Sequence, residues 1–500
     1  MIVVIAGVTV PGKYLGGKPL TIKELEEWFK IVDKPVKVLA GPAAKFGIGT
    51  IGGRLAELPT KVKENFDILV KGDPEIVIRE IISENSVDKA DPYATRRSYD
   101  EIEEFIVKGA RIVLQHPNHG LNLIAEIETY RGCPRAITGG CSFCIEPLYG
   151  LPKFRKQKCI VREIEELYNL GVKFFRLGRQ PDIFTYRAEG VGDVEYPKPK
   201  PEEIKKLFYG IRNVAPNLKT LHIDNVNPGT VANHPKEARE VAKVIVKYHT
   251  PGDVAAFGVE SVDPVVVRLN NLKVTMEEAL KAVEIINEIG AQRGYNGLPE
   301  LLPGINLLFG LKGETKETYR INFEFLKRIV ERGLMIRRIN IRQVMVFPAT
   351  RMWDIGDRVI RRHKRYFKSF KAKVKKEIEP RLLRKLVPKG TVLREVFTEK
   401  HIGEYTYARQ VGSYPLILKI PEKLPLHVFT NFTIVDYEHR SAIAIPYPLN
   451  VNKAKRKLLE LIPNISHNDV LNILKNRPFK SLNQLSLVIK NKDCIKYLSI

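Results

Sequence analysis

Short apolar runs alternate with amphipathic stretches along most of the chain, a pattern typical of α/β folds. In residues 1–115, three apolar runs predict strands, at 2–6, 36–40 and 66–70. Two segments with helical periodicity lie among them, at 22–31 and 75–82. The first piece is therefore expected to be a small α/β layer.

Residues 116–350 repeat the order strand then helix. Apolar runs predict six strands, at 122–129, 173–177, 220–225, 254–259, 304–310 and 338–347. The clearest helical periodicities between them are at 201–212, 235–248, 275–289 and 315–331. Six βα units with a parallel sheet predict a partial (β/α)6 barrel, in which functional groups gather at the carboxyl ends of the strands.

The pattern changes after residue 350. Residues 351–450 open with a run of Lys and Arg and continue with short strand-like runs, at 391–397, 414–420, 427–435 and 441–446. This predicts a small, basic, β-rich domain. Residues 451–500 predict a pair of short helices, at 454–461 and 468–475, joined as a hairpin.

The net charge of the chain indicates what kind of partner it binds. The 500 residues carry a formal charge of +25 with a pI near 9.6. Clustered Lys and Arg gain affinity for phosphates by displacing counterions, so a nucleic acid is the expected partner. A basic surface on a heat-adapted protein is the alternative, because such proteins are rich in Lys and Glu.

Apolar runs and cysteine usage indicate the cellular compartment. The opening run at residues 1–10 is too short to span a bilayer, and neither a signal peptide nor a longer apolar run is visible. Three of the five cysteines fall within twelve residues, unlike a secreted disulfide framework. A reducing cytoplasmic location without a membrane partner is expected.

Those three cysteines, Cys133, Cys141 and Cys144, follow the first predicted barrel strand. Three thiolates leave one iron of a four-iron cubane open for an exogenous ligand. Gly139 and Gly140 allow the loop a tight backbone, and the neighbouring Arg131 and Arg135 would offset negative charge. A [4Fe–4S] cluster is the favoured interpretation.

Two other uses of these cysteines stay open. A zinc site normally has four ligands, and His116 and His119 ahead of the loop are the nearest candidates to complete one. The C-x-x-C spacing of Cys141 and Cys144 also occurs in redox-active proteins. The two remaining cysteines have no partner in the sequence and are expected to be packed free thiols, at Cys159 and Cys494.

The cysteine loop, with an aromatic residue before its third cysteine, resembles the radical S-adenosylmethionine (SAM) superfamily, although seven residues rather than the common three separate Cys133 from Cys141. Residues 257–264 (FGVESVDP) and 304–315 (GINLLFGLKGET) resemble later strand ends of the same barrels, in the same order. More narrowly, the chain resembles an archaeal group with a C-terminal helix-hairpin-helix motif. Members of that group begin with additional residues, so residues 1–115 are expected to be an incomplete domain.

The resemblance implies cofactors and a reaction. A [4Fe–4S] cluster at the three cysteines would bind SAM at its open iron, and one electron from an external donor would cleave SAM to a 5′-deoxyadenosyl radical. Polar groups at strand ends are the implied SAM contacts: Gln180, Asp224, Asn225, Glu260, Ser261 and Arg342. Glu260 with Ser261 could instead cap the following helix. Arg342, like Arg338, could instead pair with a carboxylate.

The appended pieces suggest a substrate. Residues 351–450 resemble the TRAM-type RNA-binding barrel of tRNA methylthiotransferases in position, size and charge. Tyr366, Phe367 and Phe370 would stack bases, or else belong to a core. The helix-hairpin-helix resemblance of residues 451–500 has Asn464 and Ser466 where glycines are usual, so a packing role is as plausible there as phosphate binding.

The N-terminal piece, residues 1–115, resembles the Rossmann-like α/β layer ahead of some cobalamin-binding radical SAM enzymes. It has no D-x-H-x-x-G motif, so a structural layer is expected and cobalamin is not. Together these features favour a radical SAM enzyme that modifies RNA, most simply tRNA. The alternative is a nucleic-acid-binding protein whose cysteines hold a structural zinc ion or cluster without turnover.

Overall fold

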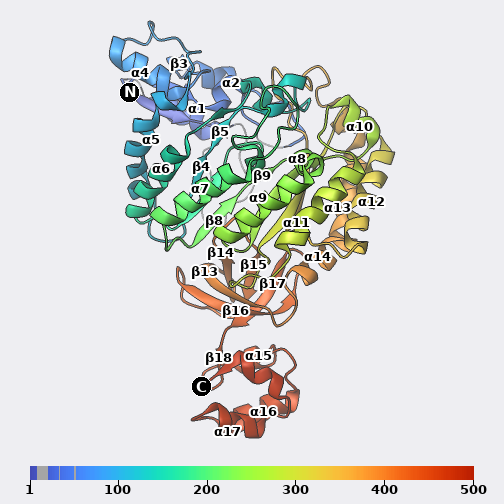
Figure 1. Ribbon diagram of the computed structural model, residues 1–500. Coiled ribbons are helices and arrows are strands. Elements are labelled where there is room, and N and C mark those ends of the chain that lie inside the picture. The colour runs from blue at the N-terminus through green and yellow to red at the C-terminus, as the bar shows by residue number, and fades with distance from the viewer. Residues whose placement is uncertain (8–20, 33, 50–51) are drawn as a thin grey trace.

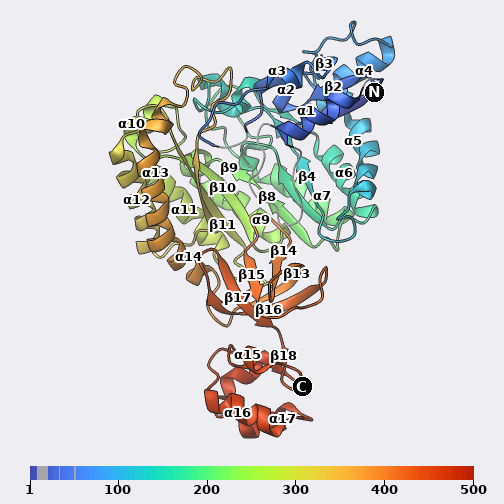
Figure 2. The ribbon, with the colours of Figure 1, turned by 180° about the vertical axis from the view of Figure 1, so that it is seen from behind.

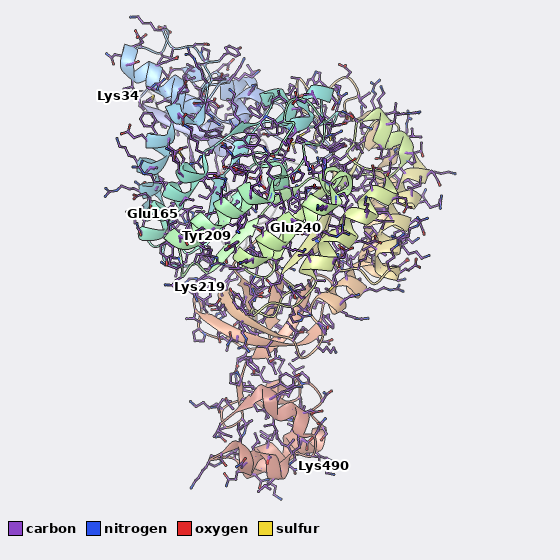
Figure 3. All side chains as sticks on the ribbon, viewed as in Figure 1. Lys34, Glu165, Tyr209, Lys219, Glu240 and Lys490 are labelled. Atoms are coloured by element: carbon purple, nitrogen blue, oxygen red, sulfur yellow. The ribbon has the colours of Figure 1, made fainter. Side chains whose placement is uncertain are left out.

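The computed structural model describes residues 1–7, 21–32, 34–49 and 52–500. The N-terminal domain lies at one end of a central barrel, and a small closed sheet lies at the other end with the C-terminal helices beyond it (Figures 1 and 2). Lys34 and Lys490 mark these two extremes of the molecule in Figure 3. No helix in the described ranges is long and apolar enough to cross a membrane.

The N-terminal domain is a three-stranded parallel sheet in the order β1 (Ile2–Ile5), β2 (Lys37–Ala40) and β3 (Ile68–Leu69). Its helices are α1 (Ile22–Ile31), α2 (Pro42–Phe46), α3 (Thr60–Lys63) and α4 (Pro74–Glu84). Thr21 and Glu24 form a capping box at the start of α1, which is why the helix begins where the apolar periodicity predicts. The predicted α/β layer is confirmed, and α5 (Glu103–Gly109) leads from it to the barrel.

The six predicted barrel strands are all present and parallel. They are β4 (Ile124–Glu128), β7 (Phe174–Gly178), β8 (Thr220–Ile223) with β9 (Asn225–Val226), β10 (Asp253–Glu260), β11 (Leu301–Phe309) and β12 (Arg338–Gln343). Asp224 alone separates β8 from β9, and its carbonyl accepts a hydrogen bond from the Ala256 amide. The strands form two sheets, β4-β7-β8 and β9-β10-β11-β12, which adjoin at Asp224 and together make a partial (β/α)6 barrel that is open between β4 and β12.

The last strand ends earlier than the predicted 338–347. After Gln343 the chain turns to the N-terminal domain, where the amide of Val346 donates to the carbonyl of Arg54. Residues 344–347 keep their apolar character because they pack between the two domains: Val344 and Val346 are fully buried. An apolar run buried by tertiary contacts is indistinguishable from a strand in the sequence.

Helices cover the outside of the barrel (Figure 1). They are α6 (Gln157–Asn169), α7 (Pro201–Val214), α8 (Pro228–Asn233), α9 (Pro235–Tyr248), α10 (Pro264–Leu269), α11 (Met276–Gly290), α12 (Lys316–Glu331) and α13 (Arg358–Glu377). Their apolar faces and the strands share one continuous core, which includes Phe175, Phe257 and Phe325. That shared core is what holds the strand ends, and so the site, in place.

Helix α13 decides between the two roles predicted for the aromatic residues in the basic run. Phe370 is buried in the barrel core with its ring centroid 4.8 Å from that of Phe309, and Phe367 lies 5.7 Å from the same ring. These two rings cannot stack on bases, because the helix needs them to bind the barrel. Tyr366 remains exposed.

The predicted small β-barrel is confirmed as a closed sheet in the order β13-β14-β15-β17-β16. The strands are β13 (Val392–Ile402), β14 (Tyr405–Gln410), β15 (Ile417–Ile420), β16 (Phe429–Tyr437) and β17 (Ser441–Pro446). The predicted domain start at residue 351 precedes α13 and α14 (Glu379–Leu386), so the closed sheet itself begins only at Val392. Strand β14 was not predicted, because its tyrosines, threonine and arginine alternate without an apolar run.

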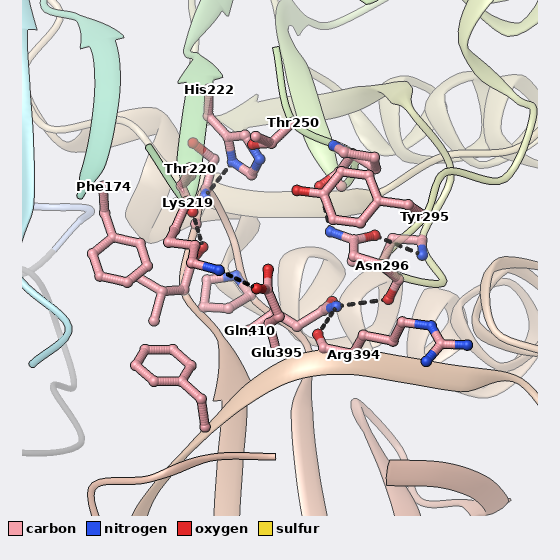
Figure 4. A pocket seen from close by; sticks show the side chains of 18 of the residues that line it. Phe174, Lys219, Thr220, His222, Thr250, Tyr295, Asn296, Arg394, Glu395 and Gln410 are labelled. Carbon is pink, nitrogen blue, oxygen red and sulfur yellow. Dashed lines mark hydrogen bonds and ion pairs between the residues drawn. The ribbon is translucent and has the colours of Figure 1, made fainter. Parts of the chain in front are cut away.

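The small barrel closes the floor of the large one, at the amino ends of its strands (Figure 4). Lys219 donates to Glu395 at 2.5 Å, and the Thr220 hydroxyl donates to the Val411 carbonyl at 2.6 Å. The amide of Ser413 donates to Nδ1 of His222 at 2.9 Å. Burial lowers the pKa of His222 to about 4, so the ring is neutral and can accept this bond.

The C-terminal piece, residues 449–500, has its own core and lies below the small barrel in Figure 1. Its elements are β18 (Leu449–Asn450), α15 (Arg456–Leu459), α16 (His467–Asn476), α17 (Leu482–Val488) and β19 (Leu498–Ser499). Asn464 has a φ of +64°, and Ser466 caps α16 in a box with Asp469. The two substituted glycine positions thus serve the turn and the cap, and the helix-hairpin-helix assignment stays a prediction.

Candidate metal and cofactor site

The three cysteines lie on one loop at the carboxyl end of β4. The loop is enclosed by a short hairpin of β5 (Tyr130–Arg131) and β6 (Lys153–Phe154). Gly139 and Gly140 have φ of +75° and +61°, and a Cβ on Gly140 would lie 2.3 Å from Pro147 Cγ. The backbone needs glycine here, as the sequence indicated. The loop brings Cys133, Cys141 and Cys144 to one cavity of about 280 Å³.

The ends of four other strands form the opposite wall of this cysteine cavity. Side chains on this wall are Gln180, Asn225, Glu260, Lys273 and Asn306. A Cβ on Gly258 would lie 2.6 Å from Lys273 Nζ, so the absence of a side chain in β10 leaves room for the ammonium group. The cavity therefore combines three thiols with three cationic side chains, two carboxylates and several amides, the cations being Arg135, Arg179 and Lys273 and the carboxylates Glu146 and Glu260.

Arg135 ties the thiols to the barrel. Its Nη1 donates to Cys141 Sγ at 3.0 Å, while its Nε donates to Glu195 at 2.7 Å and its Nη2 to the carbonyl of Asn271 at 2.9 Å. Only 2% of the side chain is exposed. A guanidinium held this firmly stabilises negative charge on sulfur, which is the role predicted for it.

Arg131 does not share that role. Its Nη1 donates to Asp73 at 3.3 Å and its guanidinium lies 4.7 Å from the ring centroid of Tyr149. It also pairs with Glu128. The prediction that it offsets cluster charge is wrong, because Arg131 does not line the cysteine cavity and is paired instead with Asp73 of the N-terminal domain and Glu128 of β4.

The chemistry of the donors fits an iron–sulfur cluster. Burial raises the pKa of Cys133 to about 11 and that of Cys144 to about 12, so as free thiols both would be neutral. All five cysteines are free, and the three in the loop line one cavity. Metal coordination would supply the missing stabilisation of the thiolates, with Arg135 and Lys273 nearby.

The histidines considered for zinc lie elsewhere. His116 and His119 precede β4, whereas the cysteines follow it, so the strand separates them. Nε2 of His119 lies 2.7 Å from the carbonyl of Leu170. Among the described residues, no three His, Cys, Asp or Glu side chains come close enough to hold a single ion. Thiolates of a cubane bind different irons and lie further apart than ligands of one zinc ion.

Lys273 and Asn306 are site residues that the sequence analysis did not identify, and Lys273 is the charged one. It is enclosed in the cavity, where Nζ donates to the carbonyl of Gly258 at 3.0 Å and lies 3.9 Å from Glu260 Oε1. Burial pulls the pKa of Lys273 down, but the neighbouring Cys141 and Glu260 outweigh burial and raise it above the ordinary value. Lys273 follows α10 rather than a strand, so no strand-end pattern pointed to it.

The side chains of Glu260 and Ser261 lie in different places in the structure. Glu260 has a φ of +65° and its carboxylate enters the cavity, where burial raises its pKa. Ser261 is 1% exposed, and its hydroxyl accepts hydrogen bonds from Asn322 and from the Asp263 amide. Asp263 is the residue that caps α10. The structure therefore brings Glu260, but not Ser261, to the cavity.

The other implied SAM contacts are also divided. Gln180 and Asn225 line the cavity, although the side-chain amide of Gln180 is engaged by Thr129 and by the carbonyl of Leu177. Asp224 instead accepts a hydrogen bond from the Tyr414 hydroxyl at 3.2 Å, deeper in the barrel. Arg342 is exposed on β12 beside the opening of the barrel and forms no ion pair with any described residue.

The two cysteines outside the loop are as predicted. Cys159 is buried in α6, and Cys494 is buried in the C-terminal core. Burial raises the pKa of Cys494 to about 11. Both are packed free thiols.

A six-stranded open barrel with three cysteines after its first strand defines the class of radical SAM proteins. The sequence model of the radical SAM superfamily matches residues 127–326, from β4 into α12. The chain belongs to this superfamily. It is 52% identical over 444 residues to an uncharacterised protein of Methanocaldococcus jannaschii, and this match covers 88% of this chain and 81% of that protein. It is 41% identical over 498 residues to an uncharacterised protein of Archaeoglobus fulgidus, covering all of this chain and 87% of that one.

Solved radical SAM enzymes are similar in fold. The methyltransferase TsrM from Kitasatospora setae is 15% identical, with a TM-score of 0.38 and 66% of each chain covered. Methylornithine synthase (PylB) is 16% identical, with a TM-score of 0.30, over 53% of this chain and 66% of that one. Coproporphyrinogen III oxidase (HemN) from Escherichia coli is 18% identical, with a TM-score of 0.28, over 45% and 44%.

Proposed function

We propose that this protein is an enzyme that holds a [4Fe–4S] cluster through Cys133, Cys141 and Cys144 and cleaves SAM reductively. The convergence of three thiols, Lys273 and Glu260 on one cavity carries the proposal. The bound cluster and SAM would supply a 5′-deoxyadenosyl radical, using an electron from an external donor.

The residues of the cavity suit the polar end of SAM. SAM carries a carboxylate and an amino group, and on the wall facing the cysteines the cavity offers the ammonium of Lys273 and the carboxylate of Glu260. Asn225 and Asn306 add amide groups for further hydrogen bonds. The barrel wall around them excludes water, which strengthens each of these interactions.

Anaerobic reconstitution tests the proposal. The wild-type protein is expected to bind about four irons with matching sulfide and to release 5′-deoxyadenosine from SAM when given a strong reductant. Cys141→Ala is expected to lose both properties. Cys159→Ala is the matched control, because it also removes a buried thiol but leaves the cysteine loop untouched. Protein that binds zinc and stays colourless, or release that survives Cys141→Ala, would overturn the proposal.

The proposed substrate is RNA, most simply tRNA. Helix α13 supports this because it exposes ten basic side chains along its 20 residues: Arg358, Arg361, Arg362, Lys364, Arg365, Lys368, Lys371, Lys373, Lys375 and Lys376. In the described part of the chain, the pair of Arg361 with Asp357 is the one ion pair that they form. Basic groups without acidic partners attract a polyanion most strongly.

The substrate is tested by comparing modified nucleosides. RNA from a strain lacking the gene is expected to lack one modified nucleoside that is present in the parent, as measured by mass spectrometry. The wild-type gene should restore that nucleoside, and the Cys144→Ala gene should not. Identical nucleoside profiles in parent and deletion strain would exclude RNA as the substrate while leaving SAM cleavage intact.

A further inference from the structure

A second cavity, of about 490 Å³, lies on the far side of the barrel from the cysteines. It is enclosed by the start of β12, by α14, and by the strands and loops of the small barrel. The segment 414–417 of the small barrel separates it from a neighbouring cavity of about 290 Å³, which Figure 4 shows. Arg337 lines both cavities.

The 490 Å³ cavity, called the floor cavity from here on, has a large excess of positive charge. Four arginines line it against a single carboxylate, that of Glu379: Arg337, Arg338, Arg409 and Arg440. Glu379 pairs with Arg440, and Arg409 pairs with Glu399. Two of the four guanidiniums are thereby neutralised, and Arg337 and Arg338 are left.

Arg337 is the least compensated charge in the cavity. Its side chain is 8% exposed, and its buried Nε has no hydrogen-bond acceptor. No described residue forms an ion pair with it. Burial and then the neighbouring Arg338 lower its pKa to about 10. An arginine that stays charged in such surroundings destabilises the fold unless an anion accompanies it.

Arg338, next to Arg337, also lacks an acidic partner among the described residues. Its guanidinium lies 4.1 Å from the ring centroid of Tyr414 and donates to Asn340, but it pairs with no carboxylate among the described residues. Two adjacent guanidiniums repel each other, so a protein without a ligand here gains nothing from burying both. Paired forks of this kind match the oxygens of a phosphate group.

We infer that the floor cavity binds a small phosphorylated molecule whose phosphate lies between Arg337 and Arg338. The opposite wall is apolar, with Leu382, Leu383 and Leu416, so it suits the uncharged body of such a molecule. The volume exceeds what a lone phosphate needs. An RNA strand fits less well, because Arg337 is almost completely buried, whereas the basic side chains of α13 are exposed.

Thermal unfolding and calorimetry of the reconstituted protein test the site, with inorganic phosphate and phenyl phosphate as probes and ionic strength held constant with chloride. Both probes are expected to raise Tm saturably in the wild type. Tighter binding of phenyl phosphate would identify an organic phosphate as the ligand, and equal binding would identify free phosphate. Arg337→Met and Arg338→Gln are expected to weaken binding by at least about tenfold, since each removes charge-assisted hydrogen bonds.

Two further comparisons keep the test decisive. Arg337→Met is expected to unfold at the same or a higher temperature than the wild type without phosphate, because it removes an uncompensated buried charge. Arg239→Gln removes an exposed arginine paired with Glu288 on the outside of the barrel and should leave phosphate binding unchanged. The inference fails if no saturable binding occurs, if all variants bind alike, or if an RNA oligonucleotide, but neither small phosphate, binds in a manner that depends on Arg337.

Discussion

At the scale of single residues, the cavity depends on buried charges whose partners are far apart in the chain. Lys273 lies on the segment after α10, yet it meets Gly258 of β10 and the thiols of the cysteine loop. Arg135 meets Asn271, which is 136 residues away. Such pairs hold a site rigidly, because neither partner can move without exposing the other's charge.

Lys273→Met is expected to weaken SAM binding by roughly tenfold to a hundredfold, the usual cost of one charge-assisted hydrogen bond, while iron content stays near that of the wild type. Equilibrium binding of SAM to reconstituted protein measures this. Lys281→Met is the control, because Lys281 also donates to a backbone carbonyl, of Ala232, but on the outside of the barrel. Unchanged SAM affinity in Lys273→Met would contradict the assigned role.

Asp182 predicts a pH dependence. It is 2% exposed, Oδ1 accepts from the Phe184 amide, and burial raises its pKa to about 7. An unfolded Asp has a pKa of about 3.9, so between about pH 4 and 7 the unfolded state loses its proton while the folded state keeps it. This group therefore stabilises the fold below about pH 4, and that stabilisation is lost as pH rises through about 7.

Asp182→Asn is expected to remove this loss. The free energy of unfolding of the variant, relative to wild type, should rise between pH 4.5 and 8 by on the order of 1–3 kcal/mol, as measured by denaturant titration. Asp193→Asn, at an exposed position, should show no such trend. A wild-type protein with parallel pH dependence to Asp182→Asn would show that the carboxyl is ionised throughout.

At the scale of secondary structure, α13 serves two functions on two faces. Its apolar face, with Phe370 and Val374, packs into the barrel core, and its other face carries the basic side chains. The sequence predicted the charge but assigned the aromatic residues to a separate domain. Amphipathic periodicity shows that one face is buried, and only the fold shows which core buries it.

Neutralising part of the basic face is expected to weaken tRNA binding. A variant with four changes to Gln, at Lys364, Arg365, Lys368 and Lys371, should lose about tenfold or more in affinity. The slope of log K against log salt should fall by up to about 3. The control removes the same charge from α7 and α9, at Lys205, Lys206, Lys243 and Lys247. Equal losses in both variants would show that net charge, rather than α13, attracts the RNA.

At the scale of the whole molecule, the two ends of the barrel have different tasks. The cysteine cavity lies at the carboxyl ends of the strands, and the small barrel closes the floor (Figure 2). Residues 411–416 of the small barrel fit against the floor, and the Tyr414 hydroxyl reaches Asp224 inside it. The close approach depends on Gly412, where a Cβ would lie 2.5 Å from His222 Cε1.

Gly412→Val is therefore expected to force the small barrel from the floor. Overpacking of this kind costs about 1–3 kcal/mol, and unfolding should broaden or split into two transitions in calorimetry. Gly109→Ala is the control, because a Cβ there meets nothing within 4 Å. A single transition with an unchanged Tm in Gly412→Val would show that the two barrels do not depend on this contact.

The sequence by itself determined the order of the elements and the cysteine loop. Strand and helix periodicities, the glycine pair at 139–140 and the spacing of Cys133, Cys141 and Cys144 are local features, set by neighbours along the chain. They sufficed for the six barrel strands and for four of the five strands of the small barrel, whereas the superfamily resemblance implied three of the cavity residues outside the loop, Gln180, Asn225 and Glu260.

Only the tertiary structure decided which polar groups meet. It turned Ser261 away from the cavity, brought Lys273 into it, and placed Arg338 against Tyr414 of the small barrel. The physical reason is that these contacts join segments of the chain separated by tens to hundreds of residues. Local periodicity carries no information about such pairs, because their distance is set by how the helices and the two barrels pack.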